Sequence, residues 1–230
     1  MTALVVLPGL DGTATLHAEF VASVGPAFDS VTVVPYPPDE ALGYVALEAL
    51  VRAQLPAATP FVLLGESFSG PVALSIAADP PPNLVGLVLS TTFAKSPTPL
   101  LSPFAALTSI APVRAVPVPL LSWLLFGRWA TPQLQASLQS ALLAVSPAVL
   151  RFRAAEAMRA NVSASLGSIA VPALYLRSSH DRLLSPAAGR HILSAIPQCT
   201  TADIAGPHLL LQTAPKDCAR AVGAFSRLLG

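Results

Sequence analysis

Charged residues are scarce in this sequence. Lys and Arg together number 13 and Asp and Glu number 12, so 11% of the 230 residues are charged and the net charge is +1. Binding to a polyanion through its backbone requires clustered basic side chains, and no segment here combines clustered Lys or Arg with aromatic residues. The composition therefore argues against nucleic acid as a partner.

Cysteine is nearly absent as well. Cys199 and Cys218 are the 2 cysteines, and they do not follow any metal-ligand spacing. A chain of this length buries a core large enough to fold without disulfides. We expect two reduced thiols and no metal site, although the sequence alone leaves a bridge between the two cysteines open.

Long uninterrupted hydrophobic runs are also missing, although 53% of residues are hydrophobic and the mean hydropathy is +0.64. The most apolar region, 100–126, is interrupted by four prolines and an arginine: Pro103, Pro112, Arg114, Pro117 and Pro119. A membrane-spanning helix needs about 20 apolar residues with few such breaks. The first residues have no basic segment, and their apolar stretch ends at Pro8, unlike a signal peptide. We expect a cytoplasmic protein without stable membrane insertion.

Short apolar runs alternate with helix-like stretches along most of the chain. Such runs are typical of strands buried on both faces of a parallel sheet, and six are expected: Ala3–Leu7, Val31–Val34, Phe61–Leu64, Leu84–Leu89, Ala173–Leu176 and a weaker Thr200–Ile204. Apolar residues at helical spacing predict helices at Leu42–Leu55, Phe68–Ala78, Pro186–Ile196 and Pro215–Leu229. The alternation predicts an α/β fold with helices on both faces of a mainly parallel sheet.

The alternation stops between Phe93 and Ser168. That stretch contains no good strand but has helical patterns at Gln133–Ala144 and Ala148–Asn161, and it is too long for a loop of a compact domain. We expect residues 1–93 and 168–230 to form the core, and residues 94–167 to form a helical cap inserted into it.

The segment 61–71 carries the most informative motif. An apolar strand leads into Gly65-Glu-Ser67-Phe-Ser69-Gly70, and a helix of small residues follows. This is the context of a nucleophile elbow, a tight strand-to-helix turn that exposes a serine hydroxyl. The usual pattern is Gly-x-Ser-x-Gly, so Ser69 departs from it. A Gly- and Ser-rich turn without catalytic function is the alternative.

A nucleophilic serine needs a base, and the base needs an orienting carboxylate. His208 follows the last strand, and Asp181 lies in a polar loop after the fifth strand, which gives the chain order Ser67, Asp181, His208 stated for α/β-hydrolases. The other histidines suit structural roles better, because one lies near a helix start, one beside the predicted acid and one inside a helix: His17, His180 and His191. These positions predict a Ser-His-Asp triad.

Backbone N–H groups should stabilise the oxyanion. The N–H of Phe68 lies at the start of a helix, and the loop 7–13 after the first strand contains two glycines that let its N–H groups turn toward the site. We expect Leu10 to be the second donor, with Asp11 as the alternative donor or as a helix cap.

Together these residues resemble the α/β-hydrolase superfamily, in particular small single-domain bacterial esterases with a short helical cap. The resemblance implies hydrolysis through an acyl-enzyme on Ser67, without metal or cofactor. It also implies two additional strands before the first, which would be missing here because two residues precede it. Pro8 stands where the family usually has a histidine.

The cap is expected to select the substrate. Its aromatic residues either pack it onto the core or line an apolar pocket, and we expect the pocket to include Trp123, Phe126, Trp129 and Phe152. A small hydrophobic carboxylic ester is the predicted substrate. A charged substrate would instead require buried cap arginines such as Arg151, Arg153 or Arg159.

Other functions remain open at this point. The same triad serves acyltransferases, thioesterases, lactonases and perhydrolases, and the same scaffold serves lyases and ligand-binding proteins without turnover. The sequence is equally compatible with a monomer and a homodimer.

Overall fold

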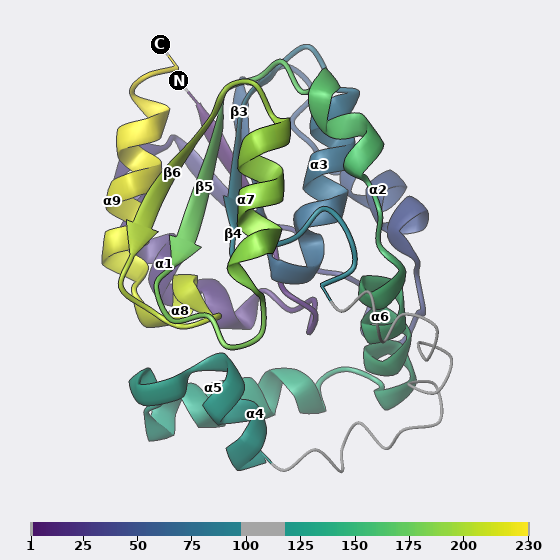
Figure 1. The fold of residues 1–230 in the computed structure, drawn as a ribbon, viewed down its shortest axis with the longest axis vertical. Coiled ribbons are helices and arrows are strands. Elements are labelled where there is room, and N and C mark those ends of the chain that lie inside the picture. The colour runs from purple at the N-terminus through teal and green to yellow at the C-terminus, as the bar shows by residue number, and fades with distance from the viewer. Residues whose placement is uncertain (1, 98–117, 230) are drawn as a thin grey trace.

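A six-stranded parallel sheet forms the centre of the molecule (Figure 1). The computed structural model describes residues 2–97 and 118–229. The strand order is β2-β1-β3-β4-β5-β6, and every neighbouring pair is parallel. The strands are β1 (Ala3–Leu7), β2 (Ser30–Val33), β3 (Phe61–Glu66), β4 (Leu84–Ser90), β5 (Ala173–Ser178) and β6 (Cys199–Ile204). The predicted fold class, with six strands, is confirmed.

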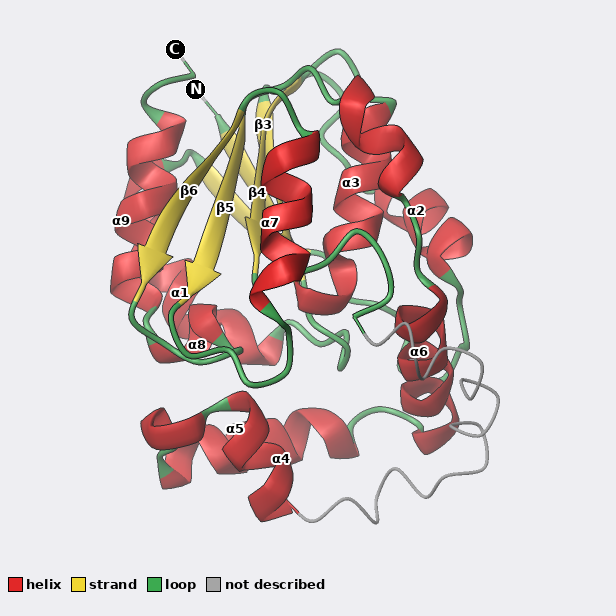
Figure 2. Ribbon diagram, in the orientation of Figure 1, coloured by secondary structure: helices red, strands yellow, loops and turns green. Residues whose placement is uncertain are grey.

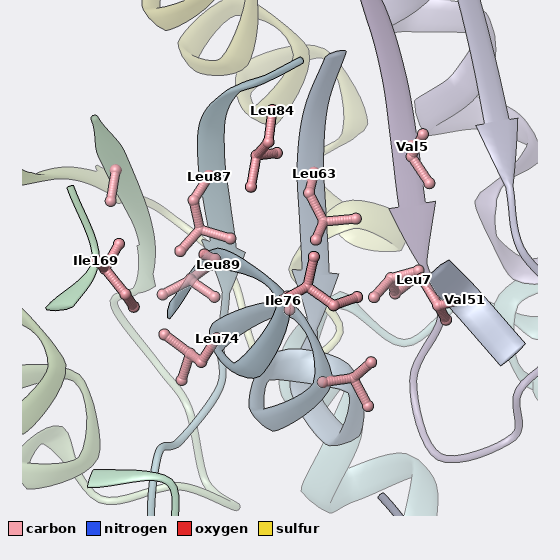
Figure 3. Packing of buried hydrophobic residues seen from close by; sticks show 14 of the residues in the cluster. Val5, Leu7, Val51, Leu63, Leu74, Ile76, Leu84, Leu87, Leu89 and Ile169 are labelled. Atoms are coloured by element: carbon pink, nitrogen blue, oxygen red, sulfur yellow. The ribbon is translucent and has the colours of Figure 1, made fainter. Parts of the chain in front are cut away.

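Helices cover both faces of this sheet (Figure 2). One face packs against α1 (Ala18–Val24) and α9 (Pro215–Ser226). The other face packs against α2 (Tyr44–Arg52), α3 (Gly70–Ala78) and α7 (Pro186–Ala195). The central strands β1 and β3 are buried along their whole length, because each face is covered. Figure 3 shows side chains of β1, β3 and β4 meeting those of α2 and α3 in this second core.

Several single turns of helix connect these elements. They comprise the short helix α8 (Leu210–Thr213) and the 3-10 segments η1 (Thr15–His17), η2 (Gly25–Ala27), η3 (Ser67–Ser69), η6 (Gly127–Trp129) and η7 (Ser163–Ser168). Two of them matter for the site, because η3 carries the predicted nucleophile and α8 follows the predicted base.

Three helices of the inserted region lie beyond the carboxyl ends of the strands (Figure 1). They are α4 (Val118–Leu125), α5 (Pro132–Leu143) and α6 (Pro147–Arg159). An antiparallel bridge between Lys95 and Asn161 joins the two ends of the insertion. The sequence does not predict helix α4, because Pro119 interrupts its apolar run. Proline is tolerated there because it lies in the first turn, where its missing N–H has no helical partner.

Both cysteines are free thiols, Cys218 buried and Cys199 half-buried, so no bridge joins them. Burial raises the pKa of the Cys199 thiol to about 11. Across the described ranges, 2–97 and 118–229, no helix is long and apolar enough to cross a membrane.

Candidate active site

The predicted catalytic residues lie where the strand order reverses. The chain passes from β1 to β2 on one side and then returns to place β3 on the other side of β1. Loops that leave adjacent strands in opposite directions open a crevice at their carboxyl ends, which is where open α/β sheets bind ligands. The loops after β1 and β3 carry the predicted oxyanion donor Leu10 and the predicted nucleophile Ser67.

Ser67 has a strained backbone that its neighbours hold in place. Its φ of 48° lies in the left-handed region, which is uncommon for a residue with a side chain. The hydroxyl of Thr92, just beyond β4, donates a hydrogen bond to the Ser67 carbonyl. Gly65 and Gly70 permit the close approach: a Cβ at Gly65 would lie 2.7 Å from the Ala73 Cβ, and one at Gly70 would overlap Thr92. The turn therefore has the geometry of a nucleophile elbow.

Ser67, His208 and Asp181 form one continuous hydrogen-bonded chain. The Ser67 Oγ lies 2.8 Å from His208 Nε2, and His208 Nδ1 lies 2.8 Å from Asp181 Oδ2. The carboxylate accepts from Nδ1–H, which leaves Nε2 free to accept the serine proton. The His208 side chain is 1% exposed, so it is almost completely shielded from water.

Asp181 is fixed by its own loop. Its Oδ1 accepts hydrogen bonds of 2.8 Å from the N–H groups of Leu183 and Leu184, so Oδ2 remains for His208. A carboxylate that accepts hydrogen bonds from three donors keeps its orientation. This geometry suits a group that orients an imidazole.

The loop after β1 contains a backbone N–H group without an acceptor among the described residues. The N–H of Gly12 donates to the Gly9 carbonyl at 3.0 Å, so the Leu10 N–H, on the same peptide as that carbonyl, points the opposite way. Among the described residues the Leu10 N–H has no acceptor. The N–H of Phe68 lies at the start of η3, where first-turn donors have no helical partner. Asp11 instead accepts from the N–H and hydroxyl of Thr13.

The departure of Ser69 from the usual motif has a structural explanation. Its hydroxyl, fully buried, donates to the Pro8 carbonyl and accepts from the Tyr36 hydroxyl at 2.6 Å. A glycine at 69 would lack this link between the elbow and the loop after β1. The side chain that breaks the motif therefore joins the two halves of the predicted oxyanion hole.

A buried polar cluster includes Glu66, the residue before the predicted nucleophile. The sequence does not indicate this cluster. His17 Nε2 lies 2.8 Å from Glu66 Oε2, and both side chains are at most 1% exposed. The Gln212 amide donates to the same carboxylate oxygen at 3.3 Å. Burial lowers the pKa of His17, but the Glu66 carboxylate outweighs this effect and the pKa lies above its ordinary value of 6.5. The pair was missed because its residues lie 49 positions apart.

Asp11 lies beside this cluster and is 7% exposed. Burial raises its pKa, although its hydrogen bonds from Thr13 act in the opposite direction. The structure thus makes Asp11 a buried acidic group next to the site, in place of the helix cap considered from the sequence: no side-chain cap bond forms at the start of η1.

An apolar cavity of about 320 Å³ opens onto the Ser67 and His208 side chains. Its walls come from the loops after β1, β3, β4, β5 and β6 and from the three helices of the inserted region. The residues from those helices recur at helical spacing and are Leu121, Leu125, Leu138, Leu142, Ala154, Ala157 and Met158. Volumes of about 300–1,000 Å³ are usual for small-molecule sites, so the cavity suits a small ligand.

The four aromatic residues predicted for the pocket are not among the described residues that line this cavity. Trp123 is 54% exposed beneath the Arg182 guanidinium, and Trp129 packs against the His180 ring. Phe126 is fully buried in the contact between the inserted region and the core, and Phe152 lies on α6. Their size suits packing between layers, whereas the cavity wall is made by the leucine and alanine faces of the helices.

The remaining sequence candidates lie away from the reacting atoms. His180 hydrogen-bonds Ser179 in the acid loop, and His191 on α7 pairs with Ser163. Arg153 is buried, but it bonds to backbone carbonyls and does not line the cavity, while Arg159 is 53% exposed. Within residues 2–97 and 118–229, no three His, Cys, Asp or Glu side chains gather as metal ligands would.

Solved structures share this architecture. The thermophilic esterase from Thermogutta terrifontis has a TM-score of 0.81 and 20% identity, with 100% of this chain and 90% of that chain covered. The bromoperoxidase from Bacillus anthracis has a TM-score of 0.82 and 15% identity, covering 98% and 92%. The enol-lactonase from Burkholderia xenovorans LB400 has a TM-score of 0.78 and 18% identity, covering 97% and 90%. At these identities the likeness shows the fold.

Sequence comparison identifies the family. Among curated proteins, none matches the chain significantly. The family model described as serine aminopeptidase S33 matches residues 44–207, more than two thirds of the 230 residues. The matched range begins with α2 and includes the Ser67 elbow and the Asp181 loop, and it ends one residue before His208. The chain therefore belongs to this family of hydrolases, within the α/β-hydrolase superfamily.

Proposed function

We propose that this protein is a serine hydrolase that cleaves small, largely hydrophobic carboxylic esters. One observation carries the proposal: the Ser67–His208–Asp181 chain, with 2.8 Å at each link, ends in an apolar cavity beside free backbone N–H groups. These are the parts that acyl transfer to a serine requires.

The reaction follows from the geometry. Ser67 Oγ attacks the ester carbonyl carbon while His208 Nε2 takes its proton, and Asp181 stabilises the imidazolium. The N–H groups of Leu10 and Phe68 stabilise the oxyanion of the tetrahedral intermediate. His208 then returns the proton to the leaving alkoxide, which departs as an alcohol. Water, activated by the same imidazole, releases the acid and restores Ser67.

The cavity walls favour an uncharged acyl group. Among the described residues that line it, Asp11 is the one polar side chain besides Ser67 and His208, and its carboxylate is already bonded to Thr13. The Arg153 guanidinium faces backbone carbonyls. A charged acyl group would therefore lose its hydration without gaining a partner. A short to medium hydrophobic chain suits a volume of about 320 Å³.

The same site supports related reactions, and the comparison proteins include an esterase, an enol-lactonase and a bromoperoxidase. Lactones, thioesters and peracid formation use the same acyl-enzyme, and an acceptor alcohol in place of water would give acyl transfer. The family description names an aminopeptidase. A peptide substrate of an aminopeptidase has a free amino group, which would need a carboxylate partner in the site. The carboxylate of Asp11 lines the cavity, but this residue is only 7% exposed and its carboxylate is already bonded to Thr13. For this reason we favour esters over peptides.

The proposal extends to the organisation of the chain. Residues 1–93 and 168–230 act as the catalytic core and residues 94–167 as the cap that selects the acyl chain. The protein works in the cytoplasm as a monomer or homodimer on a small-molecule substrate, without metal or cofactor.

Hydrolysis of p-nitrophenyl esters from acetate to decanoate tests the proposal. We expect activity on short and medium chains, and a loss of at least about 10³-fold in kcat for Ser67→Ala and His208→Gln. The matched controls Ser194→Ala and His191→Gln, both on α7, should keep wild-type kcat. Lactone, thioester and alanine p-nitroanilide substrates measured in parallel separate the alternatives. Binding of an ester without turnover by the wild-type protein would indicate a ligand-binding protein.

A further inference from the structure

Arg153 is the largest fully buried side chain of the described structure. It takes no part in the reaction steps described above. It extends from α6, in the inserted region, toward the loop after β1 and is 1% exposed. Its Nη1 donates to the carbonyls of Leu10 at 3.1 Å and Asp11 at 2.8 Å, and its Nη2 donates to the Pro37 carbonyl at 2.9 Å.

The environment of this guanidinium is unusual for a buried cation. Among the described residues, its hydrogen-bond partners are backbone carbonyls, and the nearby Asp11 carboxylate is bonded to Thr13. The guanidinium also lies 5.5 Å from the centre of the Tyr36 ring, whose π face favours a cation. Burying a charge is costly unless hydrogen bonds compensate for it, and here backbone carbonyls provide them. The Arg153 guanidinium therefore holds the backbone at Leu10, Asp11 and Pro37 in place.

These bonds fix the peptides on both sides of Leu10. The Gly9–Leu10 peptide is held by the Gly12 N–H, which donates to the Gly9 carbonyl, and the Leu10–Asp11 peptide is held by Arg153. The Asp11 carbonyl, on the same peptide as the Gly12 N–H, also accepts from Arg153. The guanidinium thus fixes the turn whose geometry sets the direction of the Leu10 N–H.

The loop is built to admit this side chain. Gly12 has a φ of 70°, and a Cβ at this position would overlap the Arg153 guanidinium. Glycine therefore serves twice here: it adopts the left-handed backbone, and it leaves room for Nη1 beside the Asp11 carbonyl.

We propose that Arg153 is a positioning residue for the oxyanion hole, through which the cap completes the catalytic site. The proposal rests on the proposed function, since it concerns how the Leu10 N–H is aimed at the oxyanion. Arg153 does not touch substrate or line the cavity, so its loss should affect the transition state more than ground-state binding.

Arg153→Met removes the donors and keeps the aliphatic volume, and Arg159→Met is the matched control, because it removes an exposed arginine from the same helix. We expect kcat on p-nitrophenyl butyrate to fall about 10- to 100-fold in Arg153→Met, with KM within about 3-fold, because misplacing one oxyanion donor has effects of this size. Arg153→Lys, whose ammonium reaches fewer carbonyls, should fall between this variant and wild type. Arg159→Met should match wild type.

Inhibition by a matched pair of ketones separates positioning from a general loss of structure. 1,1,1-Trifluoroheptan-2-one forms a tetrahedral adduct with an active serine and places an oxyanion in the hole, whereas heptan-2-one binds as a neutral ketone. Arg153→Met should raise the Ki of the trifluoro ketone by the same factor by which kcat falls and leave the Ki of heptan-2-one within about 2-fold.

Two outcomes overturn the inference: a folded Arg153→Met with wild-type kcat and trifluoro ketone affinity, or equal weakening of both ketones. If Arg153→Met does not fold by circular dichroism, the comparison passes to Arg153→Lys against Arg159→Lys, and wild-type values in Arg153→Lys then overturn it. Failure of the proposed function looks different, because the wild-type protein would then neither hydrolyse esters nor bind the trifluoro ketone more tightly than heptan-2-one.

Discussion

Replacing Ser69 with alanine tests the link between the elbow and the loop after β1. The substitution leaves the Pro8 carbonyl and the Tyr36 hydroxyl without their partners, and both lie in a region where the Ser69 side chain is fully buried. An unpaired buried polar group costs about 1–3 kcal/mol, so Ser69→Ala should destabilise the protein by about 2–6 kcal/mol. The destabilisation should be visible as a lower midpoint of urea unfolding, followed by tryptophan fluorescence.

The Tyr36 share of this cost can be isolated with a double-mutant cycle. Tyr36→Phe alone should cost about 1 kcal/mol, since it removes one hydrogen bond and leaves Ser69 bonded to Pro8. In Ser69→Ala/Tyr36→Phe no tyrosine hydroxyl is left unpaired, so the total should fall short of the sum of the single changes by about 1–3 kcal/mol.

Tyr44→Phe provides the matched control. The Tyr44 hydroxyl is buried and has no hydrogen-bond partner among the described residues, so its removal should not destabilise the protein. Additive single changes, or a Ser69→Ala variant within about 0.5 kcal/mol of wild type, would refute the reasoning.

Three further predictions concern the elbow, the buried pair and the cavity. Glu66 raises the pKa of His17 above 6.5. The contribution of His17 to the free energy of unfolding should therefore be full below about pH 6.5 and decline as the pH rises through the folded-state pKa. Urea titrations across pH 5–9 should show this decline in the wild-type protein and not in His17→Gln. Gly70→Ala should reduce kcat on p-nitrophenyl butyrate by at least about 100-fold, because the new methyl group overlaps Thr92 and displaces the elbow; activity above a tenth of wild type would contradict this. Ala154→Phe should fill part of the cavity and lower kcat/KM for octanoate at least about 10-fold more than for acetate, and an unchanged chain-length profile would show that the acyl chain binds elsewhere.

Much of the core follows from local sequence signals. Central strands buried on both faces appear as continuous apolar runs, and β1 begins and ends as predicted. The weaker signal of β6 also has a physical reason, because an edge strand with several exposed positions needs fewer apolar residues. The two helical layers could be inferred because parallel strands must be connected by crossovers, whereas the strand order comes from the structure.

The parts that sequence did not reveal depend on contacts between distant segments. The His17–Glu66 pair joins η1 to the end of β3, and Arg153 on α6 meets the loop after β1 more than 140 positions earlier in the chain. A histidine or an arginine in such a position looks like any other surface residue until the fold brings its partners together. Aromatic content does not indicate the cavity walls either, because the i, i+4 leucines of α4 and α5 form part of them.

Mass spectrometry of the trapped acyl-enzyme tests the central claim most directly. After brief mixing with p-nitrophenyl butyrate and an acid quench, the account predicts a butyryl group on the peptide that contains Ser67, and none on Ser67→Ala. His208→Gln should acylate at least about 10³-fold more slowly. Turnover by Ser67→Ala at the wild-type rate, or an acyl group on a residue other than Ser67, would contradict the account.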